Sequence, residues 1–202
     1  VVNSAIGGST NCPPHLIAIA RHLGLELDVR DWQTSGYDVP LLLNMQPAGK
    51  YLGERFHRAG GVPAIMWELK QAGLLHANRP TVTGKTMAEN LAGQESNDRE
   101  MIRPFAEPLK EKAGFLALQG NLFDFAIMKT SVISPAFRER YLSRPGCEGI
   151  FEARAIVFDG SSDYHARIND PALKIDDSCM LVMRGAGPVG WAKRRIAPRY
   201  FM

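Results

Sequence analysis

The sequence predicts an α/β fold for the first part of the chain and a mostly β fold for the second. Three observations support this prediction. Apolar residues recur at helical spacing after a glycine-rich turn near the N-terminus and again after Gly60-Gly61, whereas short β-like segments separated by Gly and Pro dominate beyond residue 112. The 202 residues are 45% hydrophobic and 22% charged, as in a globular protein with a sizeable core.

The N-terminal segment predicts a strand end, a turn and a helix. Residues 1–11 indicate the end of an apolar strand followed by a turn, in which Gly7-Gly8 permits unusual backbone angles. Ser9–Asn11 are helix N-cap residue types, and Pro13-Pro14 fits a first helical turn. Apolar residues at helical spacing extend the predicted helix to residue 23.

Further elements alternate between helix, strand and turn up to residue 92. In order, they are a short helix from Asp31 to Gly36, a buried strand over Val39–Asn44, a loop over residues 47–53, a helix from Gly60 to Gly73, a turn or short strand over Thr81–Thr86 and a short helix over Met87–Ala92.

The character of the chain changes after residue 98. Asp98–Lys112 is polar and contains two prolines, which predicts a linker and a domain boundary near residues 104–113. A small helix is expected over Phe137–Leu142. The predicted strands are Phe115–Leu118, Ala126–Ile133, Ala153–Phe158 and Met180–Arg184.

Charge, hydropathy and cysteine content exclude several classes of protein. The net charge of +3 falls to −1 without residues 193–202, so the basic balance gives no support for a nucleic-acid partner. Apolar runs are too short for a membrane-spanning helix. Three scattered cysteines do not form a disulfide framework and indicate a reducing cytoplasm (Cys12, Cys147 and Cys179).

Several local patterns favour ordinary structural roles. Thr83–Thr86 resembles the end of a phosphate-binding loop, but Arg79 stands where that loop needs glycine, so a turn is favoured. His15 and His22 lie seven residues apart, whereas metal ligands on one helix usually lie three or four apart. Asp159–His165 contains a conceivable Asp-His catalytic pair but favours a solvated polar loop.

Two segments remain as candidate anion sites. The Gly7–Asn11 turn leads into a helix N-terminus, where backbone N–H groups and the helix dipole favour negative charge; the alternative is a well-capped helix. Arg184 precedes a glycine-rich loop at residues 185–190, and an arginine beside flexible backbone suits a carboxylate or phosphate.

The longer motifs follow one another in a definite order. They are GGSTN-x-x-x-HL-x-AIA, QPAGKYLGE, AGGVPA, LLH-x-x-x-x-TVTGKT-x-x-EN, GNLFDFAIMKTSVIS, FDG-x-x-DYHARI-x-D and RGAGPVG. In this order, from Val1 to about Trp191, the chain resembles the dihydroxy-acid and sugar-acid dehydratase family, which includes phosphogluconate dehydratase. The details QPAGK, IRP, MKTS and DYH most resemble the aldonic-acid branch, the arabinonate and xylonate dehydratases. The branched-chain amino-acid enzyme is the alternative.

The resemblance implies a hydro-lyase. Such an enzyme removes water from a 2,3-dihydroxy acid and yields a 2-keto-3-deoxy acid, with a 2Fe–2S cluster and Mg²⁺ as cofactors. It also implies that residues 1–108 end a large N-terminal α/β domain and that residues 109–191 begin a C-terminal β-barrel-like domain, incomplete here. The family's cluster cysteines and Mg²⁺ ligands lie upstream and its serine base lies downstream. We therefore expect no catalytic or metal-ligand residue in this chain, and Cys12, Cys147 and Cys179 match no cluster ligand.

Within this chain the resemblance and the turn chemistry together predict contacts to a small sugar-acid substrate. Ser9, Thr10 and Asn11 are expected to hold a substrate oxyanion, Lys129 to reach the substrate from the second domain, and Arg184 either to bind substrate or to pin its loop. The full-length enzyme is expected to be a cytoplasmic homo-oligomer with no nucleic-acid or membrane partner.

The resemblance ends in a basic tail. Residues 192–202 replace the expected continuation that carries a metal-ligand glutamate, and a shift of reading frame would produce such a tail. The chain is therefore expected to be a central fragment that is inactive alone, and a truncated, non-catalytic pseudoenzyme is a further alternative.

Overall fold

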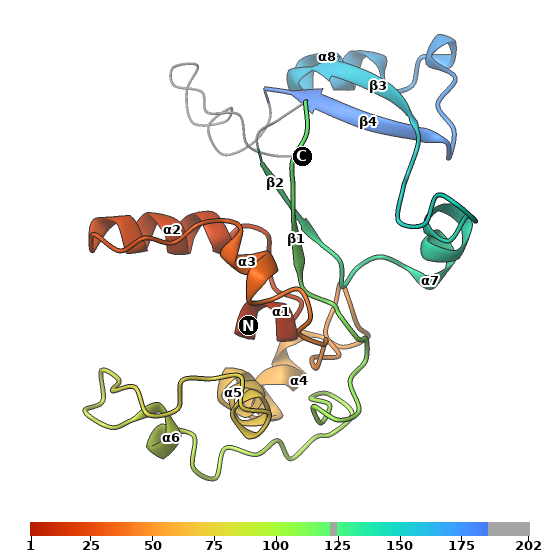
Figure 1. Cartoon of the computed structure of the whole chain (residues 1–202). Coiled ribbons are helices and arrows are strands. Elements are labelled where there is room, and N and C mark those ends of the chain that lie inside the picture. The colour runs from red at the N-terminus through yellow and green to blue at the C-terminus, as the bar shows by residue number, and fades with distance from the viewer. Residues whose placement is uncertain (122–124, 186–202) are drawn as a thin grey trace. The chain divides into compact units, whose positions relative to one another are not determined.

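The computed structural model describes residues 1–121 and 125–185 (Figure 1). The chain forms two compact units, each considered by itself. The first contains Val1–Leu118 together with Ile127–Val132, and the second contains Gln119–Ala126 and the residues from Ile133 onward. The Gly-rich loop and the basic tail, at 186–190 and 192–202, lie outside the described residues.

The first unit contains six helices in its described residues. They are α1 Val2–Ala5, α2 Cys12–His22, α3 Asp31–Thr34, α4 Gly53–Arg58, α5 Gly61–Gln71 and α6 Met87–Asn90. Four of them, α2, α3, α5 and α6, confirm predicted helices, because each has a local start or stop signal in the sequence. Thr86 caps α6 in a reciprocal capping box with Glu89. The turn at residues 81–86 is confirmed and is closed by a single β-bridge between Pro80 and Thr86.

Two local predictions in this unit are wrong. The expected strand end at the N-terminus is helix α1, because the N–H groups of Ala5 and Ile6 donate to the carbonyls of Val1 and Val2, at 3.0 and 3.1 Å. Two β-branched valines had suggested an extended chain, but local hydrogen bonds decided otherwise. Helix α4 begins at Gly53, the last residue of the predicted loop, and continues to Arg58 through residues for which no element was predicted.

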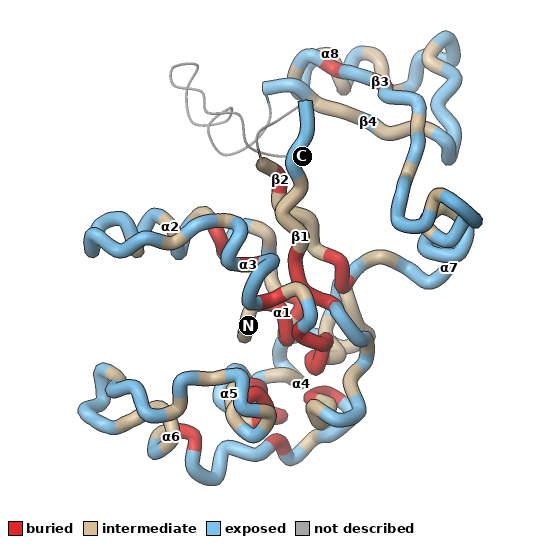
Figure 2. Tube along the Cα trace, viewed as in Figure 1, coloured by how far each residue is buried: buried red, intermediate tan, exposed pale blue. Residues whose placement is uncertain are grey.

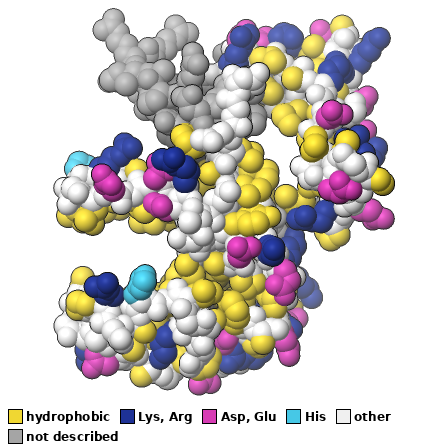
Figure 3. Space-filling model, in the orientation of Figure 1, with side chains coloured by type: hydrophobic (Ala, Val, Ile, Leu, Met, Phe, Trp, Pro, Cys, Tyr) yellow, Lys and Arg dark blue, Asp and Glu magenta, His cyan; other side chains and the backbone are white. Residues whose placement is uncertain are grey.

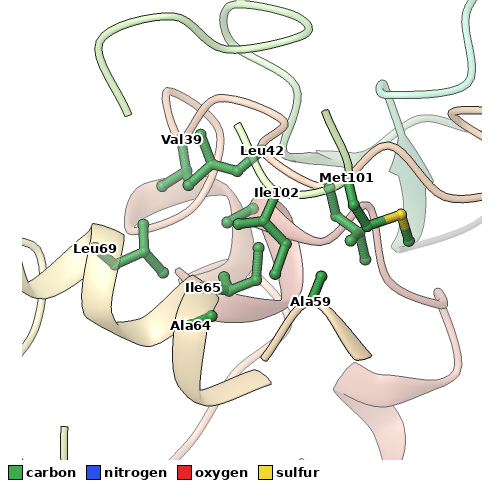
Figure 4. Packing of buried hydrophobic residues seen from close by; sticks show 10 residues of the cluster. Val39, Leu42, Ala59, Ala64, Ile65, Leu69, Met101 and Ile102 are labelled. Carbon is green, nitrogen blue, oxygen red and sulfur yellow. The ribbon is translucent and has the colours of Figure 1, made fainter. Parts of the chain in front are cut away.

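The core of the first unit is built from segments that are far apart in the sequence (Figures 2 and 4). Val39–Asn44 is extended and mostly buried as predicted, but it pairs only through single bridges, Leu41 with Lys110 and Leu43 with Ile102. The fully buried side chains of this hydrophobic cluster are Ala5, Leu42, Leu43, Ala64, Ile65, Leu69, Met101 and Ile102.

The polar segment Asp98–Lys112 is not a free linker. Met101 and Ile102 are fully buried in the core, and the backbone of Arg103 donates to the carbonyl of Leu42 at 2.8 Å. The prediction of a linker came from average polarity, which does not register two apolar residues within a charged stretch.

Arg55 of α4 binds the segment Asp98–Lys112 through ion pairs. Its guanidinium donates to both oxygens of Asp98, at 2.7 and 3.0 Å, and to Glu100 at 2.8 Å, and it lies 3.8 Å from the centre of the Tyr51 ring. The hydrogen bonds from Arg55 lower the pKa of Asp98. The pKa of Glu100 is lowered by its hydrogen bond from Tyr51, which has the larger effect, and by that from Arg55.

We expect Arg55→Met to destabilise the protein at neutral pH and to flatten its loss of stability in acid. A carboxyl whose pKa is depressed by folding stabilises the protein above its unfolded pKa, and this contribution is lost as the pH falls through the lower folded pKa. Urea midpoints measured from pH 7 to about pH 2, which is below the range of about pH 4 in which free Asp and Glu titrate, test this. The control is Arg58→Met on the same helix, whose exposed pair with Glu54 contributes little. An unchanged acid limb in Arg55→Met would contradict the prediction.

Two short strands connect to this unit. Strand β1 Phe115–Leu118 is confirmed at the predicted residues, and it forms a two-stranded sheet with β2 Ala126–Lys129. Phe115 is fully buried, and the Gln33 side chain accepts a hydrogen bond from the backbone of Ala117 at 2.8 Å. Helix α3 and strand β1 therefore belong to one packed body.

The second unit contains a parallel βαβ arrangement. Its described elements are α7 Pro135–Phe137 with a π-helical turn at Arg138–Leu142, β3 Arg154–Asp159, α8 Gly160–Arg167, a 3₁₀ turn at Pro171–Leu173 and β4 Cys179–Arg184. Strands β3 and β4 pair in parallel, from Arg154 with Cys179 to Asp159 with Arg184. These elements confirm the predicted small helix at residues 137–142 and the two predicted strands.

The polar loop expected at Asp159–His165 is instead the start of helix α8. Asp163 accepts from the backbone of Asp159 at 2.9 Å and pairs with Arg167 at 2.8 Å, which stabilises the first turns of the helix. Tyr164 packs edge-on against Phe158 of β3. Within the described residues no hydrogen bond joins Asp163 to His165, so the structure does not assemble the Asp-His pair considered above.

The described part of the chain is a mixed α/β structure with two two-stranded sheets, and it contains no closed barrel. Within residues 1–121 and 125–185, no helix is both long and apolar enough to cross a membrane. Charged side chains of both signs are scattered over the face shown in Figure 3.

Candidate functional site

The turn between α1 and α2 is shaped by two glycines. Gly7 has a left-handed φ of +57°, and a Cβ on it would lie 3.0 Å from Leu41 Cδ1 and 3.2 Å from Ser131 Oγ. The N–H of Gly8 donates to the carbonyl of Asn3 at 2.8 Å, and a Cβ here would collide with the Asn3 side chain. The chain can therefore make this turn tightly only with glycine at both positions.

The turn before α2 leaves two backbone donors available. The N–H of Asn11 donates to Ser9 Oγ, and the N–H of Cys12 to the Ser9 carbonyl, both at 3.1 Å. Pro13 and Pro14 have no N–H, and the Asn11 side chain makes no capping bond. Among the described residues, nothing accepts from the backbone N–H of Ser9 or of Thr10. These two donors belong to the turn before the N-cap Asn11, not to the helix itself, and they suit an anion close to the positive end of the helix.

Lys129 brings a positive charge to the same turn. Its Nζ, at the end of β2, donates to the Gly7 carbonyl at 3.1 Å. Burial lowers its pKa, and no carboxylate in the described part of the chain lies within ion-pair distance of it. An ammonium has three donors, so two remain after the Gly7 contact. The half-buried cation is thus held in place without being neutralised.

Neighbouring residues fix the segment that carries Lys129. Thr130 is buried, and its Oγ1 and N–H donate to the Gly114 carbonyl at 2.7 and 3.0 Å. The Nζ of Lys110 donates to the carbonyl of Ser131 at 2.6 Å. Residues 129–131 are therefore held on both sides against the body of the first unit.

The structure brings four of the five predicted contact residues into one compact unit. Ser9, Thr10, Asn11 and Lys129 all belong to the first unit, although Lys129 was expected to come from the second domain. Arg184 lies in the second unit, where it is exposed and forms a two-fold ion pair with Asp159, at 2.7 and 3.0 Å. Ser131, which was not singled out from the sequence, lies next to Gly7: its Oγ is 3.2 Å from the position that a Cβ on Gly7 would take. The signal available in the sequence was its position two residues after Lys129.

The described residues do not match a metal or cluster site. Within them, no group of three or more His, Cys, Asp and Glu side chains could share a metal ion. Cys12 lies beside the turn, and burial raises the pKa of its thiol, which opposes the thiolate that a cluster needs. Cys147 and Cys179 belong to the second unit.

Two models of one protein family match successive parts of the chain. The family model for the dihydroxy-acid/6-phosphogluconate dehydratase N-terminal domain matches residues 1–90, and that for the C-terminal domain matches residues 100–195.

Curated relatives agree with both matches. D-xylonate dehydratase of Caulobacter vibrioides is 69% identical over 188 residues, which are 93% of this chain and 31% of the relative. L-arabinonate dehydratase of Rhizobium leguminosarum bv. trifolii is 40% identical over 94% of this chain and 31% of its own length. The chloroplastic dihydroxy-acid dehydratase of Arabidopsis thaliana is 38% identical over 92% and 29%. The chain spans about a third of the length of these relatives, and it belongs to the dihydroxy-acid/6-phosphogluconate dehydratase family.

Proposed function

We propose that this chain is part of a hydro-lyase that dehydrates an aldonic sugar acid of the xylonate or arabinonate type to a 2-keto-3-deoxy acid. The supporting observation is the 69% identity to a D-xylonate dehydratase, against 33–38% for the dihydroxy-acid dehydratases. The arabinonate enzymes are 38–40% identical, which is close to the identity of the dihydroxy-acid dehydratases. Their identities therefore do not distinguish sugar acids from branched-chain dihydroxy acids as substrates, and the proposal depends on the xylonate relative.

The Gly7–Asn11 turn and Lys129 are proposed to bind the carboxylate of the substrate. A carboxylate has two oxygens and one negative charge, which match the N–H groups of Ser9 and Thr10 and the ammonium of Lys129. Fixing the carboxylate orients the adjacent C2 and C3. Dehydration then removes the C2 proton and the C3 hydroxide, and the resulting enol becomes the ketone.

The remaining features of the complete protein are part of the same proposal. Asn11 and Arg184 are further substrate contacts, and breaking the Arg184–Asp159 pair would be needed to free Arg184. The α/β domain ends with residues 1–108, a β-barrel-like domain begins with residues 109–191, and residues 192–202 form a non-homologous tail. The 2Fe–2S cluster and Mg²⁺ belong to other parts of the protein. The cysteines described here are free thiols, which suits a cytoplasmic enzyme, and a homo-oligomer is testable by size-exclusion chromatography.

Keto-acid formation by the complete protein tests the function. We expect turnover of xylonate or arabinonate at a kcat/KM well above that for a branched-chain 2,3-dihydroxy acid with an alkyl end. The reverse order would favour the branched-chain amino-acid enzyme, and no turnover of either acid would favour a pseudoenzyme. The 202-residue chain alone is expected to be inactive, and turnover by it would overturn that part of the proposal.

A further inference from the structure

Ser131 carries a buried hydroxyl that has no partner. Its side chain is fully buried, and its Oγ, like Ser4 Oγ and Asn3 Nδ2, makes no hydrogen bond within the described residues. A buried hydroxyl without a partner is unfavourable, because it has lost its bonds to water. Such a group therefore calls for a specific reason at its position.

The position of Ser131 is next to the candidate anion site. Its Oγ lies 3.2 Å from the place that a Cβ on Gly7 would occupy, so the hydroxyl faces the turn. Lys129, two residues earlier, donates to the carbonyl of the same glycine. Thr130, between them, is bound to Gly114 instead. The chain thus presents an ammonium and a hydroxyl to one turn while the residue between them anchors the segment.

We propose that Ser131 is a specificity-determining residue, whose hydroxyl donates a hydrogen bond to a hydroxyl of the polyol chain of the bound sugar acid. The inference rests on the proposed function. A sugar acid carries hydroxyl groups beyond C3, whereas an alkyl dihydroxy acid offers only carbon and hydrogen there. A site that holds a polar group for a substrate hydroxyl discriminates against an analogue that lacks it. Ser131 is fully buried behind the Gly7 turn, so the substrate reaches its hydroxyl only when this turn shifts on binding.

Because the Ser131 hydroxyl makes no hydrogen bond in the unbound protein, its removal should affect substrate binding and not folding. In the complete protein, Ser131→Ala should lower kcat/KM for xylonate by about tenfold, the effect of one hydrogen bond, and leave kcat/KM for the alkyl acid unchanged. Because no hydrogen bond is lost in the unbound protein, its Tm should not fall. The rise in Tm that xylonate causes should become smaller.

Two control variants separate specificity from structure. Ser4 is also buried with an unpaired Oγ, but it faces Gly36, so Ser4→Ala should leave the substrate ratio unchanged. Thr130→Val removes the bond to Gly114 and should lower Tm while affecting both substrates equally.

Each outcome bears on a different claim. A Ser131→Ala protein with an unchanged ratio, or with equal losses for both substrates, would overturn the role of Ser131 while the wild-type activity upholds the function. If the wild type turns over neither acid, the proposed function fails. The role of Ser131 in binding is then tested by the rise in Tm on adding xylonate. An equal rise in wild type and Ser131→Ala overturns the role of Ser131, and no rise in the wild type overturns both.

Discussion

Lys129→Met should raise the KM of the complete protein for its sugar acid by about 10- to 100-fold, the range for losing a charged hydrogen bond. The ammonium of Lys129 donates a hydrogen bond to the Gly7 carbonyl, and no carboxylate in the described residues forms an ion pair with it. Steady-state kinetics with xylonate measure the effect. The matched control is Lys85→Met, because Lys85 is exposed on the Thr81–Thr86 turn. An unchanged KM in a folded Lys129→Met protein would contradict the role.

The role of Lys129 also predicts how the KM for the sugar acid depends on pH. Burial lowers the pKa of Lys129, so its positive charge is lost at a lower pH than that of a free lysine. Anion binding should therefore be strongest below this lowered pKa and should weaken as the pH rises through it. Lys129→Arg, which stays charged, should remove this alkaline weakening. A plot of KM against pH for both proteins shows whether it does.

Gly114→Ala should lower the free energy of unfolding by about 3 kcal/mol, at the upper end of what overpacking usually costs. A Cβ on Gly114 would lie 1.8 Å from the carbonyl oxygen of Gly36, and that atom belongs to the backbone, so the chain itself must move. The move would strain the bonds from Thr130 to the Gly114 carbonyl. Urea denaturation measures the loss.

A nearby glycine provides the control for this substitution. Gly120 has open space around its Cα and is exposed, so Gly120→Ala should change stability by only a few tenths of a kcal/mol. Equal effects at the two positions would show that the loss at Gly114 does not come from the contact with Gly36. If Gly114→Ala also raises the KM for sugar acid, the anchoring of residues 129–131 contributes to the site.

The sequence predicted those elements whose signals are local. Helix α5 has glycines at both ends and an apolar face at helical spacing, and β1 was placed at its observed residues. The residue types of Gly7–Asn11 predicted a tight turn that leads into a helix N-terminus, and the chain forms both. The dehydratase family was also identified from the order of the motifs, and the comparisons confirm it.

Contacts between distant segments were decided only by the tertiary structure. The burial of Met101 and Ile102 in a polar segment, and the placement of Lys129 on Gly7 across 122 residues of sequence, depend on packing that no local pattern encodes. Local propensities and caps act over a few residues, so they determine helices and turns. The proposed site, at residues 7–11 and 129–131, depends on the core because the core brings these two segments together.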